Sequence, residues 1–442
     1  MLAVIVVVFA LGYLAIAFEH PLRLNKTATA MLMGTLCWAL YAIGAERLIA
    51  PESIPEVYRV GPHPAIDYLV EGQLLGLTGE IAGILFFLMG AMTIVELIDA
   101  NEGFSIITER IRARNKTTLL WLIGFITFFL SSVLDNLTTT IVMISLLRKL
   151  LGDKRDRMIF AGLVVIAANA GGAWTVIGDV TTTMLWIKGK ITAVPLMGEL
   201  FLTSLTCLIV PLIGMSYMVR GTPEIPGEPK DKSEVPKDPQ QKLIFLVLGL
   251  AGLLSVPFFK AVTHLPPYLG MMMALSVLWL VSEFVHAKSD EKLKTSLGLL
   301  TLLKRIDMSS VLFFLGILLA VGCLGSVGVL RDLAYRLDEA IGNRDVIAVT
   351  IGFVSAVVDN VPLVAAGIEM YQDPVNARFW MLLAYCAGTG GSCLIIGSAA
   401  GVAAMGMERI DFLWYVRNIS LWATLGYLAG VGVFFLQSSL MG

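Results

Sequence analysis

The chain has 442 residues, of which 57% are hydrophobic and 15% are charged, and its formal net charge is −2. An ordinary soluble domain carries about 25% charged residues, so this composition excludes that class. The small net charge gives no field that would attract nucleic acid. The apolar residues form runs long enough to cross a bilayer core about 30 Å thick, and the sequence therefore predicts a multi-pass protein in contact with membrane lipid.

The predicted spans begin at the N-terminus. Segment 2–18 has no basic n-region and no cleavage signal of small residues, so we expect a first span rather than a signal peptide. Further apolar stretches follow at roughly 28–50, 78–99, 118–151, 157–187, 196–219, 242–260, 267–286, 308–330, 345–371, 378–406 and 411–437. The cysteines occur singly in these stretches, which favours small buried core residues: Cys37, Cys207, Cys323, Cys386 and Cys393.

Two of these stretches are interrupted by polar residues. The first, at about 118–151, is broken by SSVLDNLTTT (131–140) and has basic residues at both ends. Lysine and arginine next to a span stay cytoplasmic, so we expect a re-entrant hairpin with both ends inside and Asp135-Asn136 near its tip. The second, at about 345–371, is broken by SAVVDN (355–360) and lacks basic flanks, so both of its ends are expected outside.

A polar, proline-rich linker at 220–241 divides the chain into halves at 1–219 and 242–442, and we expect it in the cytoplasm. Three segment pairs match in the same order: ILFFLMG (84–90) with VLFFLG (311–316), SSVLDN (131–136) with SAVVDN (355–360), and GGAWTVIGD (171–179) with GGSCLIIGS (390–398). The expected fold is therefore an all-α polytopic membrane protein with two inverted-topology repeats. Each repeat holds one hairpin and one broken helix, the latter at about 157–187 and 378–406.

Three aspartates lie deep in the predicted spans: Asp135, Asp179 and Asp359. Each costs roughly 2.5–3.5 kcal/mol at the bilayer centre, and the interiors of the predicted spans offer no basic partner. Desolvation favours the neutral form of a carboxyl group, whereas a bound cation favours the ionised form, so a proton and a cation compete for one site. This competition is the chemistry of cation/proton exchange.

Neighbouring amide and hydroxyl oxygens suit a hard alkali cation, and nothing in the sequence suits a soft metal. We expect the transported ions to be Na⁺ or Li⁺ and H⁺, with no cofactor and no catalytic residue. The predicted cation- and proton-binding residues are Asp135, Asn136, Thr138, Asn169, Thr175, Asp179, Asp359 and Asn360. Possible accessory residues are Glu80, Ser131, Thr181, Thr182, Ser355, Ser392 and Ser398.

Each of these polar residues also has a simpler interpretation. A serine or threonine in a membrane helix more often bonds to a carbonyl of its own helix than to an ion. Glu80 lies near the outer end of its span, where an interfacial carboxylate and a pathway residue are equally good interpretations.

The polar segments SSVLDNLTTT, NAGGAWTVIGDVTT, SAVVDNVPLVAAGIEMY and GGSCLIIGSAAGVAAMG resemble those of NhaD-type sodium/proton antiporters. This family belongs to the ion transporter superfamily, which also contains sodium–dicarboxylate symporters and arsenite efflux pumps. The resemblance covers nearly the whole chain and implies extrusion of sodium and lithium driven by proton entry, favoured at alkaline pH. It also implies a homodimer in the inner (plasma) membrane, in which a transport domain slides against a scaffold.

The sequence departs from the dicarboxylate relatives at both hairpin tips. Those relatives carry a Ser-Asn-Thr triplet, whereas this chain has Asp135-Asn136-Leu137 and Asp359-Asn360-Val361. Aspartate would repel a carboxylate substrate, which disfavours a sodium-coupled anion symporter without removing it as the alternative. An intramembrane aspartyl protease also needs two membrane aspartates, but neither its Tyr-Asp motif nor its Gly-x-Gly-Asp motif is present at these positions.

Overall fold

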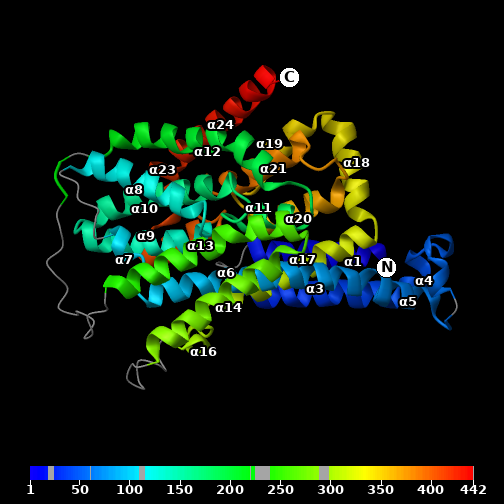
Figure 1. Ribbon diagram of the computed structural model, residues 1–442. Coiled ribbons are helices and arrows are strands. Elements are labelled where there is room, and N and C mark those ends of the chain that lie inside the picture. Colours follow the sequence, from blue (N-terminus) through cyan, green and yellow to red (C-terminus); the bar gives the residue numbers. More distant parts are fainter. Residues whose placement is uncertain are drawn as a thin grey trace. The chain divides into compact units, whose positions relative to one another are not determined.

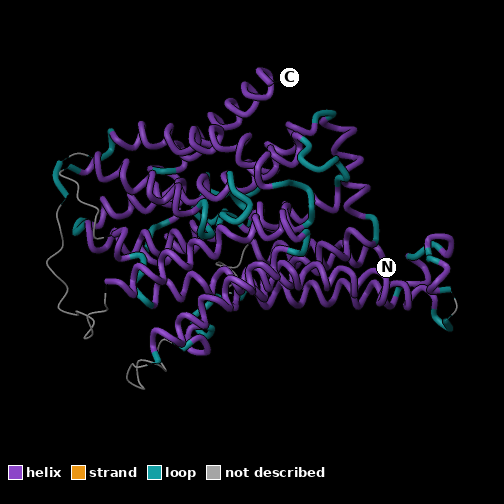
Figure 2. The backbone as a smooth tube through the Cα atoms, in the orientation of Figure 1, coloured by secondary structure: helices purple, strands orange, loops and turns teal. Residues whose placement is uncertain are grey.

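The computed structural model describes residues 1–17, 24–59, 61–108, 115–219, 221–223, 239–287 and 298–441. Within these ranges the backbone forms helices joined by turns and loops, without a strand (Figure 2). Seven helices in the described part of the chain are long and apolar enough to cross a membrane: Pro64–Ala100, Lys154–Ala173, Ala193–Ser216, Pro239–Thr263, Pro267–His286, Met308–Ser326 and Ser420–Leu440. The predicted all-α, polytopic class is confirmed.

The chain divides into two compact units, and each unit draws on both predicted halves. The first unit comprises Met1–Leu88, Asp307–Ile347 and Val361–Asp373, and the second comprises Met89–Ile306, Ala348–Asn360 and Pro374–Gly442. The division into repeats at 1–219 and 242–442 stays a prediction. Most of the predicted linker 220–241 lies outside the described residues.

Two closely packed helices, α3 and α17, organise the first unit. A methyl group on Gly34 of α3 would lie 2.5 Å from the Gly316 carbonyl oxygen of α17, so these backbones approach at a distance that only glycine permits. Trp38 adds a hydrogen bond from its Nε1 to the Leu319 carbonyl oxygen at 2.8 Å. The helical elements of this region are α1 (Leu2–Ala17), α3 (Lys26–Ile43), α4 (Ala45–Leu48), η1 (Pro51–Ser53), η2 (Glu56–Tyr58), α5 (Pro64–Asp67), the π-helical η3 (Tyr68–Leu74), α6 (Leu75–Ala100), α17 (Met308–Ser326) and α18 (Val329–Ile341).

The second unit is built around the central helix α10 (Lys154–Ala173), whose residues from Ile159 onward are all buried. Helix α10 packs against α8, α9, α12, α21 and α22, and Figure 1 shows α8, α9 and α12 beside it. The other helices that lie mostly in this unit are α7 (Ser105–Thr108), α8 (Lys116–Ser131), α9 (Asn136–Leu150), α11 (Val180–Ile187), α12 (Ala193–Ser216), α13 (Pro239–Thr263), α14 (Pro267–His286), α16 (Leu299–Leu302), α19 (Arg344–Val354), α21 (Arg378–Gly390), α22 (Ala399–Glu408), α23 (Phe412–Asn418) and α24 (Ser420–Met441). Helix α20 (Asn360–Met370) belongs to the first unit from Val361 onward.

The four predicted interruptions are all breaks between helices. They separate α8 from α9, α10 from α11, α19 from α20, and α21 from α22. Ion pairs close the base of both hairpin segments: Lys116 Nζ lies 2.6 Å from Asp156 Oδ2, and Arg344 Nη1 lies 2.5 Å from Asp373 Oδ2. Each segment therefore folds back on itself. The side of the membrane on which its ends lie stays a prediction.

Glycines let each broken helix touch the hairpin helix before it, and the contacts in the two halves match. A methyl group on Gly178 would lie 2.5 Å from the Ser131 carbonyl oxygen, and one on Gly397 would lie 2.6 Å from the Ser355 carbonyl oxygen. Small residues at these positions permit close backbone packing. The matched sequence segments thus make matched contacts, while the duplication itself stays a prediction.

All cysteines are free thiols, and every one is buried: Cys37, Cys207, Cys323, Cys386 and Cys393. Their expected role as small core residues is confirmed.

Candidate functional site

Asp179 lies in the break between α10 and α11 and is 1% exposed. Its Oδ1 accepts hydrogen bonds from the Thr181 backbone N–H and hydroxyl, both at 2.7 Å. Its Oδ2 accepts one from Asn136 Nδ2 at 2.7 Å. The carboxylate also caps the N-terminus of α11, where the helix dipole favours negative charge. These donors are all uncharged, so they orient the carboxylate without supplying a positive charge to balance it.

Asn169 joins residues of the two predicted halves. Its Oδ1 accepts a hydrogen bond from Asn136 Nδ2 at 2.9 Å, and its Nδ2 donates to Ser392 Oγ at 2.8 Å and to Ser398 Oγ at 3.0 Å. All of these side chains are at most 5% exposed. We call Asn136, Asn169, Asp179, Ser392 and Ser398 the asparagine network. Polar residues from both halves, separated by more than half of the chain, thus meet in one buried cluster.

Asp135 and Thr138 lie next to this network at the start of α9. Asp135 caps the helix by accepting hydrogen bonds from the Thr138 backbone N–H at 2.7 Å and the Thr138 hydroxyl at 2.6 Å. Asp135 and Asp359 both lie close enough to Asp179 for their charges to affect it. Like charges at such range disfavour joint ionisation, and a proton or a cation would relieve their repulsion.

The remaining predicted hydroxyls hold the backbone of the breaks. Thr175 donates to the Ser132 carbonyl oxygen at 2.6 Å, Ser131 to the Ala168 carbonyl oxygen at 2.6 Å, and Thr182 to the Asp179 carbonyl oxygen at 2.9 Å. Ser355 donates to the carbonyl oxygens of Gly352 and Ala387 at 2.8 and 3.2 Å. In this structure these hydroxyl groups bond to backbone carbonyl oxygens, and their part in cation binding stays a prediction.

Two further residues of the predicted site, Asn360 and Glu80, lie on other helices. Asn360 begins α20 and is buried, in the place that Asn136 has in α9. Glu80 is exposed on α6 and belongs to the first unit, and its accessory role stays a prediction.

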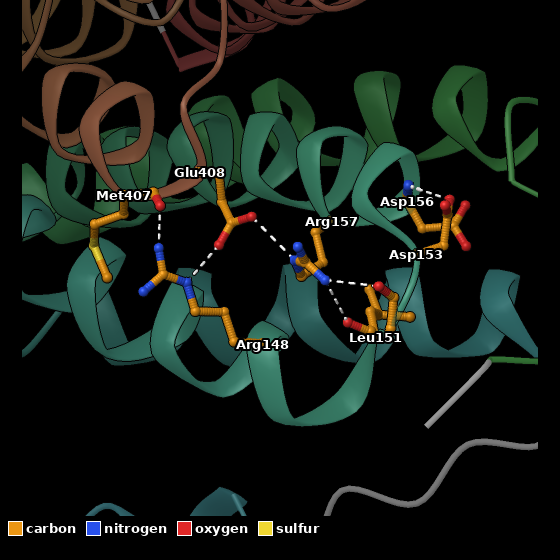
Figure 3. A network of polar contacts seen from close by, with 8 residues as sticks. Arg148, Leu151, Asp153, Asp156, Arg157, Met407 and Glu408 are labelled. Atoms are coloured by element: carbon orange, nitrogen blue, oxygen red, sulfur yellow. Dashed lines mark hydrogen bonds and ion pairs between the residues drawn. The ribbon is translucent and has the colours of Figure 1, made fainter. Parts of the chain in front are cut away.

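The sequence reasoning missed a second polar cluster, formed by Glu408 with Arg148 and Arg157 (Figure 3). Glu408 ends α22 with a side chain only 3% exposed, and its carboxylate binds Arg148 Nε at 2.7 Å and Arg157 Nε at 3.0 Å. Arg148 also donates to the Met407 carbonyl oxygen. The basic flank of the first hairpin was visible in the sequence, but its acidic partner lies about 250 residues away in the chain.

The asparagine network and this Glu408 cluster lie at opposite ends of two packed helices, α9 and α22. Helix α9 starts after Asp135 and carries Arg148 in its last turn, while α22 starts after Ser398 and ends at Glu408. The two helices therefore run in the same direction, with both N-termini toward the asparagine network. The partial positive charges of these N-termini favour anionic groups there.

Comparisons with known proteins agree with this architecture. A family profile described as "Citrate transporter" matches residues 13–377. The chain is 48% identical to sodium/proton antiporter 1 of Arabidopsis thaliana, over 96% of this chain and 71% of that one, and 46% identical to sodium/proton antiporter 2 of the same plant, over 96% of both chains. It is 32% identical to the Na(+)/H(+) antiporter NhaD of Vibrio cholerae, over 96% of this chain and 89% of that one. The chain therefore belongs to the citrate transporter family and, within it, to the NhaD-type antiporters.

Proposed function

We propose that this protein exchanges sodium or lithium ions for protons across the inner (plasma) membrane. The proposal rests on the buried Asp179 carboxylate, whose hydrogen-bond donors among the described residues are uncharged. Asn136 and Asn169 connect this carboxylate to Ser392 and Ser398. A carboxylate in this setting needs a proton or a metal cation for neutralisation. The printed names of the relatives, sodium/proton antiporters, support this choice of ions.

The exchange follows from competition at the three aspartates. Cytoplasmic sodium displaces protons from Asp135, Asp179 and Asp359, and the loaded site moves to face outside, where protons displace sodium. Either ligand neutralises the carboxylates and so lowers the free energy needed to move the site across the membrane. The empty site keeps its negative charge, and its movement is therefore unfavourable. We propose an elevator-type movement of one part of a homodimer for this step, with sodium leaving the cell as protons enter.

A sodium-coupled anion symporter is the second candidate, and the description of the matching family favours it. The aspartates at the two hairpin tips argue against an anionic substrate. Asp135, which begins the α9 half-helix, and Asp359, which precedes α20, place carboxylates where an anionic substrate would have to approach. Like charges that meet without compensation are unfavourable, so a carboxylate substrate would bind poorly.

Measurements of proton movement in everted membrane vesicles distinguish antiport from sodium-coupled anion symport. Vesicles that carry the protein are made acid inside, and NaCl, LiCl, KCl or the choline salt of a dicarboxylate is added at neutral and alkaline pH. We expect sodium or lithium to dissipate the proton gradient, as reported by a pH-sensitive dye. Uptake of radiolabelled dicarboxylate with sodium, and no response of the gradient to any cation, would replace antiport by symport.

A further inference from the structure

Helix α9 carries two buried threonines one turn beyond Asn136. Thr139 and Thr140 are both 0% exposed. Within the described residues, neither hydroxyl oxygen has a hydrogen-bond partner. A buried hydroxyl that lacks a partner loses its hydration without compensation, so this arrangement calls for an explanation.

Other buried threonines in the helices of this chain behave differently. Thr93, Thr127 and Thr389 donate to the carbonyl oxygens of Met89, Ile123 and Tyr385, each four residues earlier, at 2.6, 2.7 and 2.6 Å. This is the ordinary way in which a threonine in a helix satisfies its hydroxyl. Thr139 and Thr140 do not use it, which leaves both oxygens available to a partner that is not a protein atom.

Helical periodicity places Thr139 and Thr140 on the same face of α9 as Asn136, which belongs to the asparagine network. Positions three and four after Asn136 share its face of the helix. Asn136 itself binds Asp179 and Asn169 of the neighbouring segments, and α9 packs against α10 and α22. The next residues on this face, Met143 and Ile144, are apolar and buried. This face of α9 is therefore polar from Asn136 to the threonine pair and apolar in the next turn.

We propose that the hydroxyl oxygens of Thr139 and Thr140 bind the transported alkali cation beside Asn136 and set its affinity. This inference rests on the proposed function and names two ligands beyond the aspartates. Hydroxyl oxygens are hard, neutral ligands of the kind that alkali cations take, and their burial strips water from the ion. Because they are neutral, they contribute to cation binding without competing for the exchanged proton.

Valine and serine variants at both positions test the proposal. Valine has the shape of threonine without the oxygen, so Thr139→Val and Thr140→Val should raise the KM for sodium about tenfold, which corresponds to ~1.4 kcal/mol of lost binding. The pH dependence of transport should keep its shape. Serine keeps the oxygen, so Thr139→Ser and Thr140→Ser should retain a KM near that of the parent.

Thermal unfolding of the purified protein separates ligation from a structural role. In sodium-free choline buffer, each valine variant should melt no lower than the parent, because the missing hydroxyl had no protein partner. The rise in melting temperature on adding sodium should shrink in both variants. Thr127→Val is the matched control: it removes a hydroxyl that bonds within its helix, so it should lower the melting temperature in choline and leave the sodium-dependent rise unchanged.

Two outcomes would overturn the inference: a sodium KM and a sodium-dependent melting shift unchanged in both valine variants, or a loss of stability in choline like that of the Thr127→Val control. The proposed function fails in a different way, since the parent protein would then show neither cation-driven proton movement nor a melting shift with sodium.

Discussion

Asp135 has two roles that a substitution can separate. Its carboxylate caps α9 through Thr138, and its charge lies near Asp179. Asparagine is as good a helix cap as aspartate but cannot carry the charge. Asp135→Asn should therefore fold with a melting temperature close to that of the parent and abolish sodium-driven proton movement in vesicles. Ordinary exchange by this variant would remove Asp135 from the cation site.

Competition between protons and sodium predicts a pH dependence with a defined sign. As pH falls, protons occupy the carboxylates that sodium needs, so the apparent KM for sodium should rise, by up to about tenfold per pH unit where one proton competes. Initial rates at several sodium concentrations and pH values measure this. A KM independent of pH would mean that the two ions use separate sites.

The sequence singled out the aspartates and asparagines of the helix breaks, which the structure buries wholly or in part, but it did not single out the charged Glu408 cluster. Carboxylates and asparagines are costly in apolar segments, so Asp179 and Asn169 were conspicuous. The behaviour of hydroxyls was not predictable in the same way. Whether a threonine bonds to its own helix, as Thr127 does, or leaves its oxygen without a protein partner, as Thr140 does, depends on side-chain rotamers and packing that no spacing rule encodes.

Helices α9 and α22 are held together at their C-terminal ends by Glu408. Replacing this carboxylate leaves Arg148 and Arg157 close together without their shared counter-charge. Breaking a buried pair costs roughly 3–5 kcal/mol, and we expect Glu408→Ala to fall at the lower end because both arginines are partly exposed. Thermal unfolding in detergent measures this loss. Glu339→Ala, at an exposed position of α18, should change stability by less than about 0.5 kcal/mol.

Gly390 marks a contact at which α21 meets the backbone of α19. A methyl group there would overlap the Gly352 carbonyl oxygen, so Gly390→Ala should displace α21 and lower both thermal stability and transport. At Gly432 of α24 nothing lies within 4 Å of the same methyl position. Gly432→Ala should raise stability by about 0.5–1 kcal/mol, since alanine is the better helix former. Equal effects of the two substitutions would show that the close contact does not matter.

The sequence predicted the helix breaks better than the helix ends. Polar residues and glycine pairs inside apolar runs indicated the four breaks at α8/α9, α10/α11, α19/α20 and α21/α22. By contrast, the predicted span 308–330 was too long, because α17 ends at Ser326 and Gly328, with a φ of 82°, starts the separate helix α18. Apolar residues continue through this turn, so hydropathy alone could not find it. The division between α23 and α24 was also not predicted, although Arg417, Asn418 and Ser420 interrupt the apolar residues there.

On the scale of the whole molecule, the sequence could not predict how the chain divides into compact units. A helix that faces lipid and one that faces protein are both apolar, so composition does not reveal which helices pack together. The first unit therefore combines α3 with α17 from the opposite half of the chain. The internal sequence similarity led to the expectation that the two halves are related, but it does not specify which helices pack against each other.

An elevator-type movement predicts that parts of the chain change position relative to one another during transport. Pairs of labels can test this if one label lies on each unit, for example at Tyr335 and Val194, which are 73% and 81% exposed. We expect the distribution of label distances to differ between sodium-containing and choline buffer. A single distribution, identical in both buffers, would contradict movement between the units.

The burial of every native thiol makes such measurements straightforward. Reagents that modify cysteine need access to a thiolate, and none of Cys37, Cys207, Cys323, Cys386 and Cys393 offers it at the surface. Introduced cysteines at exposed positions should therefore react far faster than the native ones. Spectroscopic probes can then be attached to the otherwise unaltered chain, and the signal will report the chosen positions without a cysteine-free background.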